Sequence, residues 1–293
     1  MYPRSAALVQ ATRDLDRGRS TPESVEAQFG RDLGELVAGQ QRAGLDLLAD
    51  GMLRWQDLFR PLVEASEGLE SGPLTRFLDT NTFYRAPLAT GAEPRLSRPL
   101  GEHFVAPLAG PRLVTLPSPY AFSRGTGLSP RALAEGVLRP QLEALDAELV
   151  VLVEPFLARE ERPDLDGLAE ALEALAGGPR LALQLTFGDA GPLLAGLQEL
   201  PLDGIGIDFY ATGLDAVPEG FGKLLLAGVV DVRSSLLEDP NELARFAAGL
   251  RERVVGEVAL VPNGDLQYVS EPIARAKLER LGAAKTAAAE EAA

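Results

Sequence analysis

The feature that most limits the fold of this chain is a regular alternation of short apolar runs with longer amphipathic stretches. The apolar runs are rich in Leu, Val and Ile, and this near-continuous pattern is typical of strands buried on both faces. They fall at 44–50, 111–117, 147–155, 179–189, 203–209, 223–231 and 256–263. Helical patterns occupy 20–44, 129–145, 164–178, 239–254 and 270–293. Strands that alternate with helices predict a parallel sheet covered by helices.

The number of these units indicates how the sheet closes. About seven strand–helix units in 293 residues favour the α/β class and a (β/α)8 TIM barrel over an open sheet. No Gly-x-Gly-x-x-Gly follows a strand, which disfavours a dinucleotide-binding fold. No linker or internal repeat divides the chain, so we predict one domain over 1–293. The polar segment 68–100 is predicted to be a β-hairpin or lid inserted after the second strand, and 284–293 a frayed Ala/Glu tail.

Composition excludes several classes of function. The chain has no Cys, which excludes disulfides and thiolate chemistry, and a single His. A formal net charge of −15 argues against nucleic acid or an anionic membrane as the partner. No apolar run is long enough to span a bilayer, and no secretory signal is visible, so we expect a cytoplasmic location.

The candidates for chemistry are the polar residues that follow the predicted strands, because the active site of such a barrel lies at the C-terminal ends of the strands. Glu154 ends the strongest strand, where an unpaired carboxylate is expensive, so a functional or ion-paired role is as good an explanation as neither. Asp208 alternates with apolar neighbours and therefore could point into the barrel. His103 lies near the hairpin and is better explained by a surface or packing role. The other candidates are Asp50, Arg54, Asp57, Ser118, Tyr120, Gln184, Thr186, Asp189, Tyr210, Asp231, Arg233, Asn263 and Asp265.

Six segments, in order along the chain, resemble the catalytic barrel of cobalamin-independent methionine synthase, in the superfamily that includes uroporphyrinogen decarboxylase. The segments are YPRSAAL (2–8), QQRAGLDLLADGMLRWQDL (40–58), GPRLVTLPSPY (110–120), VVLVEPFLARE (150–160), AGVVDVRSSLLEDPNELARF (227–246) and VPNGDLQYVSEPIARAKLERL (261–281). The resemblance covers nearly the whole chain and implies the same barrel fold. The first strand is weak or missing, because the chain starts at Met1-Tyr2-Pro3, where the family has several apolar residues. Either the true start lies upstream or the barrel is open there.

The departures from the family concern its metal site. The resemblance implies zinc held by His-x-Cys, Glu and Cys, but the matching positions here are Gln184, Thr186, Asp208 and Gly264. Of these residues only Asp208 would ligate zinc well, since a tight site needs thiolate or imidazole. Two carboxylates that the resemblance implies for an amino-acid ammonium are replaced by Met52 and Val153. We therefore predict no metal or other cofactor.

Three functions remain open at the level of sequence. The first is a metal-free enzyme, or binder, of a small anionic molecule. In it Glu154 and Asp208 are the acid–base residues, and the ligand-contacting residues are Arg4, Arg54, Asp57, Ser118, Tyr120, Gln184, Thr186, Arg233 and Asp265. The second is a methyltransferase with a different donor or acceptor, served by a corrinoid or folate partner. The third is a non-catalytic binding protein or pseudoenzyme. A homodimer is compatible with all three.

Overall fold

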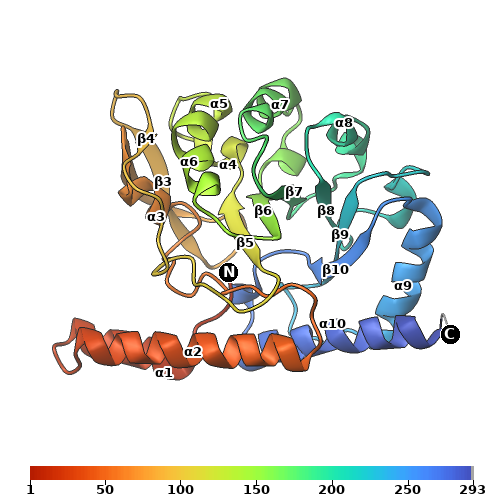
Figure 1. Cartoon of the computed structure of the whole chain (residues 1–293), viewed down its shortest axis with the longest axis horizontal. Helices are drawn as coiled ribbons and strands as arrows, with labels where there is room; N and C mark the ends of the chain where they lie inside the picture. The colour runs from red at the N-terminus through yellow and green to blue at the C-terminus, as the bar shows by residue number, and fades with distance from the viewer. Residues whose placement is uncertain (292–293) are drawn as a thin grey trace.

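The computed structural model describes residues 1–291 and is organised around a curled sheet of six parallel strands (Figure 1). Neighbours in the sheet follow the order β10-β9-β8-β7-β6-β5, so each strand pairs with the next one along the chain. The strands are β5 (Leu113–Pro117), β6 (Leu149–Glu154), β7 (Arg180–Leu185), β8 (Gly204–Asp208), β9 (Leu224–Val230) and β10 (Val258–Pro262). This sequential order of parallel strands is the order found in a barrel wall.

Helices cover the outside of the sheet. Two long helices, α2 and α10, run along one side of it, while α4 to α8 cover the opposite side in Figure 1. The helices are α1 (Ala6–Asp16), α2 (Pro22–Arg42), α3 (Arg60–Glu64), α4 (Pro119–Ser123), α5 (Pro130–Leu133), α6 (Arg139–Glu143), α7 (Leu165–Glu173), α8 (Leu194–Glu199), α9 (Pro240–Arg253) and α10 (Glu271–Glu291). Single turns are the π-helical η1 (Ala134–Leu138) and the 3₁₀ turns η2 (Leu157–Arg159), η3 (Gly191–Leu193), η4 (Leu214–Ala216) and η5 (Leu266–Tyr268).

Local sequence explains most of these elements. All residues of β8 and β9 are buried. Apart from Asp208 at the end of β8, their apolar runs predict this burial. Thr21 and Ser24 form a capping box at the start of α2, and Asp239 accepts two backbone N–H bonds at the start of α9. The helix predicted over 129–145 is instead divided into α5, η1 and α6, because Pro140 cannot donate a backbone hydrogen bond.

The hairpin expected within 68–100 is present. Strands β2 (Leu69–Arg76) and β3 (Phe83–Ala89) pair antiparallel. The two-residue strands that flank them in the chain, β1 (Ser66–Glu67) and β4 (Arg95–Leu96), also pair antiparallel. Its inner end packs Phe77 against Phe156 and Phe187, with ring centroids 6.2 Å apart in both cases. The hairpin therefore rests on the segments that follow β6 and β7.

The sheet does not form the complete eight-stranded barrel that the sequence predicted. The second predicted strand, 44–50, is reduced to a single parallel bridge between Leu48 and Arg112. The first strand is not formed within residues 1–291, in line with its weak sequence signal. The segment 2–8, expected to be a turn, leads directly into α1, a helix that the pattern had not predicted.

At the other end of the chain, α10 continues through most of the segment that was expected to fray, and residues 292–293 lie outside the described part. Gly282 allows α10 to pack closely, because a Cβ there would overlap the Ala43 carbonyl oxygen. Among residues 1–291, no helix has the length and apolar character that crossing a membrane requires.

Candidate functional site

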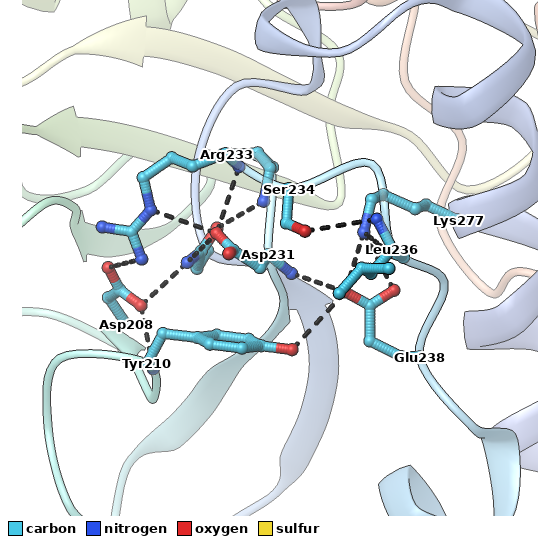
Figure 2. A network of polar contacts seen from close by, with 10 residues as sticks. Asp208, Tyr210, Asp231, Arg233, Ser234, Leu236, Glu238 and Lys277 are labelled. Carbon is cyan, nitrogen blue, oxygen red and sulfur yellow. Dashed lines mark hydrogen bonds and ion pairs between the residues drawn. The ribbon is translucent and has the colours of Figure 1, made fainter.

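A polar cluster joins the C-terminal ends of three neighbouring strands (Figure 2). Asp208 is the last residue of β8, Asp231 follows β9, and Asn263 follows β10. The Asn263 amide donates to Asp208 Oδ1 at 2.9 Å and to Asp231 Oδ1 at 3.4 Å, while its own oxygen accepts from the Val232 backbone at 3.0 Å. Asn263 is 2% exposed, so it acts as a buried link between the two carboxylates.

Arg233 brings a positive charge to this cluster. Its Nε lies 3.0 Å from Asp231 Oδ1 and its Nη2 lies 3.3 Å from Asp208 Oδ2. The guanidinium also lies over the Phe187 ring, 5.6 Å from the centroid. The Arg233 side chain is 37% exposed, and the three charged groups sum to −1. One edge of the cation thus remains open to a ligand.

Two buried oxygens in this region have no hydrogen-bond partner among the described residues. They are Asp208 Oδ2 and Thr186 Oγ1, on residues that are 1% and 3% exposed. The Arg233 contact to Asp208 Oδ2 brings the charges together without forming a hydrogen bond. Because buried polar groups are nearly always paired, these two oxygens are expected to accept from a bound molecule or an ordered water.

A buried ion pair between Glu238 and Lys277 lies next to this cluster and contacts it through the Asp231 backbone. Lys277 Nζ donates to both Glu238 oxygens, at 2.8 and 3.0 Å, and to the Leu236 carbonyl at 2.7 Å. Glu238 in turn accepts from the Asp231 backbone N–H at 2.9 Å. The Tyr210 hydroxyl donates to Glu238 at 3.4 Å, and partial burial together with this carboxylate raises the pKa of Tyr210 to about 12. The pair therefore fixes the backbone of the Asp231 loop.

The positions matched to the family's zinc ligands are neighbours in space. A Cβ on Gly264 would lie 3.8 Å from Thr186 Cγ2, and Gly206 leaves room for the Gln184 side chain beside it on β7. Their donors do not suit zinc, however. Gln184 Nε2 donates to the Pro262 carbonyl at 2.8 Å, which fixes that amide across the sheet. Asp208 faces Arg233, and Gly264 has no ligand atom in a side chain.

No group of three or more His, Asp or Glu side chains suited to hold a metal occurs in residues 1–291. The residues present at the matched positions therefore do not fit the metal that the family resemblance implies.

Glu154 lies in a different environment, at the end of β6 and separated from β8 by β7. It is 0% exposed, and its Oε1 accepts from the Phe156 and Leu157 backbone N–H groups at 2.9 and 3.0 Å. The Ser118 hydroxyl donates to its second oxygen. Burial raises the pKa of Glu154, although these hydrogen bonds act in the opposite direction. The bonds hold the turn after β6 against the turn after β5.

The predicted arginines from the N-terminal part of the chain, Arg4 and Arg54, bind other groups of the protein. Arg4 donates to the Leu53 and Trp55 carbonyls at 2.8 and 3.1 Å, and burial lowers its pKa. Arg54 forms an ion pair with Glu26 and stacks on Phe29, 4.6 Å from the ring centroid. Both guanidinium groups are thus engaged with partners in the protein.

Three further predicted residues also have partners in the protein. Asp57 accepts from the backbones of Phe59, Arg60 and Arg85 at 2.8–3.0 Å, which ties the hairpin to the start of α3. The Tyr120 hydroxyl donates to Glu160 at 2.6 Å. Asp265 pairs with the amino group of Met1.

The structure thus brings together a subset of the predicted residues. Asp208 and Arg233 meet at the carboxyl edge, and Thr186 directly follows the neighbouring strand β7. Thr186, Gln184 and Asp265 line one cavity. The sequence had not singled out Glu238 and Lys277 as a pair. A signal was available, because Lys277 is one of only three lysines in a chain that otherwise uses arginine.

This protein is of the α/β class, with a barrel-type parallel sheet and a polar cluster at the carboxyl edge of that sheet. Comparisons with known proteins identify its relatives. The family model described as "Cobalamin-independent synthase, N-terminal domain" matches residues 135–254. Together with the relatives described below, this match shows that the chain is related to the cobalamin-independent methionine synthase family. The matching model describes the N-terminal domain, whereas the sequence motifs resembled the catalytic barrel.

Several curated relatives are named 5-methyltetrahydropteroyltriglutamate–homocysteine methyltransferase. The protein from Mycobacterium leprae is 40% identical over 95 residues, which are 30% of this chain and 12% of that protein. The protein from Streptomyces griseus is 31% identical over 212 residues, which are 62% of this chain and 27% of that protein. The chain therefore matches about a quarter or less of the length of these relatives.

Solved structures support the fold. A B12-independent methionine synthase from Shewanella, in complex with selenomethionine, superposes with a TM-score of 0.72 at 18% identity, over 94% of this chain and 91% of that one. A methyltransferase from Methanosarcina mazei superposes with a TM-score of 0.50 at 15% identity, over 88% and 84% of the two chains.

Proposed function

We propose that this chain binds, and as an enzyme converts, a small anionic molecule at the carboxyl edge of β7 to β10. The observation that carries the proposal is a pair of buried oxygens without hydrogen-bond partners among the described residues. Asp208 Oδ2 lies 3.3 Å from the partly exposed Arg233 side chain, and Thr186 Oγ1 belongs to the residue that follows the neighbouring strand β7. Arg233 would contact the anionic group of the ligand, and Asp208 would accept a hydrogen bond or a proton from it.

The charge of the site narrows the ligand further. Because Arg233 already faces two carboxylates, a simple anion would meet a local charge of −1. A ligand that also carries a cationic donor, such as the ammonium group of an amino acid, would satisfy Asp208 while its carboxylate meets Arg233. The Shewanella structure holds selenomethionine, which is an amino acid of this kind. We therefore propose an amino-acid-like zwitterion as the ligand.

We also propose that ligand binding does not require zinc. This part of the proposal rests on the side chains at positions 184, 186, 208 and 264, which include no thiolate or imidazole. The proposal does not depend on Glu154 as a second acid–base residue, since that carboxyl is enclosed by protein groups. We further infer that the curled sheet is the larger part of a (β/α)8 barrel in one domain with the hairpin as a lid. A cytoplasmic location and a homodimer remain predictions of the sequence.

Methyl transfer with a different donor or acceptor is the second candidate. It is favoured by the methyltransferase names of the relatives and of the Methanosarcina mazei structure. A corrinoid or folate partner would then supply the methyl group. The two candidates share one ligand site, so a binding experiment tests both.

The test compares L-methionine with 4-(methylthio)butanoate, which lacks only the ammonium group, by isothermal titration calorimetry. We expect L-methionine to bind at least tenfold more tightly, because a charge-assisted hydrogen bond contributes about 1.5–3 kcal/mol. Asp208→Asn should remove this preference, and Arg233→Met should weaken both ligands. Arg245→Met, on an exposed arginine of α9, is the matched control and should change neither affinity.

The same titrations are repeated after zinc loading and desalting, with zinc content measured by elemental analysis. Equal affinities and far less than one zinc per chain are expected. Absence of L-methionine binding at millimolar concentration, or equal effects of Arg233→Met and Arg245→Met, would refute the ligand site. One retained zinc per chain would refute zinc independence and leave the ligand site standing.

A further inference from the structure

Phe187 is a strained residue that follows β7 and lies between the hairpin and the candidate site. Its backbone has φ = 61°, in the left-handed region that residues with a Cβ rarely adopt. The glycine that would adopt this conformation freely comes one residue later, at Gly188, where a Cβ would lie 2.8 Å from the Ala158 carbonyl oxygen. Such a conformation persists only where the surroundings enforce it, and it is concentrated at functional sites. The contacts of the Phe187 ring therefore indicate what the conformation serves.

Three groups from different parts of the chain surround the Phe187 ring. Phe77, at the inner end of the hairpin, packs against it with ring centroids 6.2 Å apart and planes at 75°. Tyr268 of η5 packs against it at 5.7 Å and 79°. The Arg233 guanidinium lies over the ring, 5.6 Å from the centroid. The ring thus joins the hairpin to the cation of the candidate site.

Arg159 of η2 joins the same parts through the backbone. Its Nη1 donates to the Phe187 carbonyl at 3.4 Å, and its Nη2 lies 3.0 Å from Asp79 Oδ2 in the turn between β2 and β3. The Asp79 side chain is 86% exposed, so this ion pair contributes little by itself. Phe77, by contrast, is 7% exposed. The packing of Phe77 on Phe187 is therefore the main contact that holds the hairpin tip against this segment.

The position of the Arg233 guanidinium depends on the ring because its contact with Asp208 is weak. The two side chains approach to 3.3 Å without a hydrogen bond, and Arg233 is 37% exposed. The firm polar contact is the 3.0 Å bond from Nε to Asp231, which leaves the far end of the guanidinium to be held by Asp208 and Phe187. A cation that is already held in place loses less freedom when it binds an anion. A ring that holds it therefore favours binding.

We propose that Phe187 is a positioning residue through which the hairpin tip controls the ligand site. While Phe77 packs on it, the ring holds the Arg233 guanidinium where the anionic group of a ligand meets it. When the tip moves away, the ring and the guanidinium lose this position. Hairpin closure and ligand binding then favour each other, because coupling between two sites is reciprocal. This inference rests on the proposed ligand site at Arg233 and adds the hairpin as its regulator.

The first measurement needs no ligand. Heteronuclear NMR spectra of the arginine side chains report the Nε–H of Arg233, which is assigned from its loss in Arg233→Met. Phe187→Leu and Phe77→Leu should each shift this resonance and speed its exchange with solvent about two- to fivefold, the factor that a cation–π contact at a partly exposed site supplies. Phe187→Tyr keeps the ring and should preserve the wild-type behaviour. Phe83→Leu is the matched control, since it makes the same change on the same hairpin at a residue that is 54% exposed.

The second measurement is the affinity for L-methionine by isothermal titration calorimetry. Phe187→Leu and Phe77→Leu should each weaken binding about two- to fivefold. The double variant should be no weaker than Phe187→Leu alone, because Phe77 acts through the ring. In the wild type, L-methionine should also slow deuterium exchange of the amides in 77–82, and this effect should be lost in Phe187→Leu. All of these variants keep a Cβ at position 187, so the backbone strain is the same in each.

An Arg233 resonance that Phe77→Leu leaves unchanged overturns the inference, and so does an equal change from Phe83→Leu. Additive losses of affinity in the double variant overturn it as well, because the hairpin would then act by another route. If L-methionine binds to none of the proteins, the proposed ligand fails, while the Arg233 resonance still decides whether the hairpin tip positions the guanidinium. Thermal unfolding checks that each variant is folded, and Phe77→Met replaces Phe77→Leu if that variant is not.

Discussion

Replacing Lys277 by Met is expected to destabilise the protein far more than replacing any exposed lysine. The Lys277 side chain is 0% exposed, and its ammonium makes three hydrogen bonds of 2.7–3.0 Å to Glu238 and Leu236. Met has a similar length and keeps the apolar packing of the stem. The change therefore removes the charge and little else.

The size of the effect follows from what is left behind. Glu238, whose side chain is 9% exposed, would keep the hydrogen bond from the Asp231 N–H and would lose its ion-pair partner among residues 1–291. Removing one partner of a buried pair costs about 3–5 kcal/mol, because the other charge stays buried and unpaired. Because Glu238 is slightly exposed, we expect Lys277→Met to lower the free energy of unfolding by about 3 kcal/mol, the lower end of this range.

The assay is urea unfolding monitored by the fluorescence of Trp55, the only tryptophan, which is 1% exposed. Lys285→Met is the matched control: Lys285 pairs with Asp46 at 2.5 Å, but the two side chains are 54% and 76% exposed. Such a surface pair contributes about 0–1 kcal/mol. The double variant Lys277→Met with Glu238→Gln should recover at least about 2 kcal/mol relative to the sum of the two single changes, because no unpaired charge remains.

The reasoning would be refuted if Lys277→Met cost no more than Lys285→Met, or if the double variant were additive. Salt gives a second check. The small effect of Lys285→Met should shrink in 1 M NaCl, whereas that of Lys277→Met should persist, because buried pairs are screened much less.

Two further predictions concern Glu154 and Gly282. Burial raises the pKa of Glu154 above its ordinary 4.5, so the folded protein binds more protons than the unfolded chain, and this contribution to stability is lost as pH rises through the folded-state pKa. Glu154→Gln should therefore gain stability relative to wild type between pH 4 and pH 7 in urea titrations, and a difference independent of pH would contradict this. Gly282→Ala should destabilise α10 packing by about 1–3 kcal/mol, since the new methyl would overlap the Ala43 carbonyl. Gly34→Ala, with open space in α2, should stabilise by up to about 1 kcal/mol, and equal Tm shifts in the two variants would show that the contact at Ala43 relaxes freely.

The sequence by itself determined the strands, most helices and the side of the sheet on which polar groups gather. Continuous apolar runs can only be buried on both faces, so β6 to β9 were predictable from local pattern. The ends of those runs also placed Thr186, Asp208 and Arg233 near one another, because parallel strands end at one edge. The hairpin was predictable from the polar, aromatic segment that interrupts the pattern.

Only the tertiary structure decided which polar residues are free to meet a ligand. Arg4, Arg54 and Asp57 carry the same functional groups as Arg233 and Asp208, but backbone carbonyls, Glu26 and the hairpin already engage them. Whether a polar side chain has a partner in the protein depends on contacts between residues far apart in the sequence, such as that of Lys277 with Glu238. The position of β10 at the end of the sheet was equally unpredictable, because a strand's pattern predicts that its faces are buried but not which strands pair with its edges.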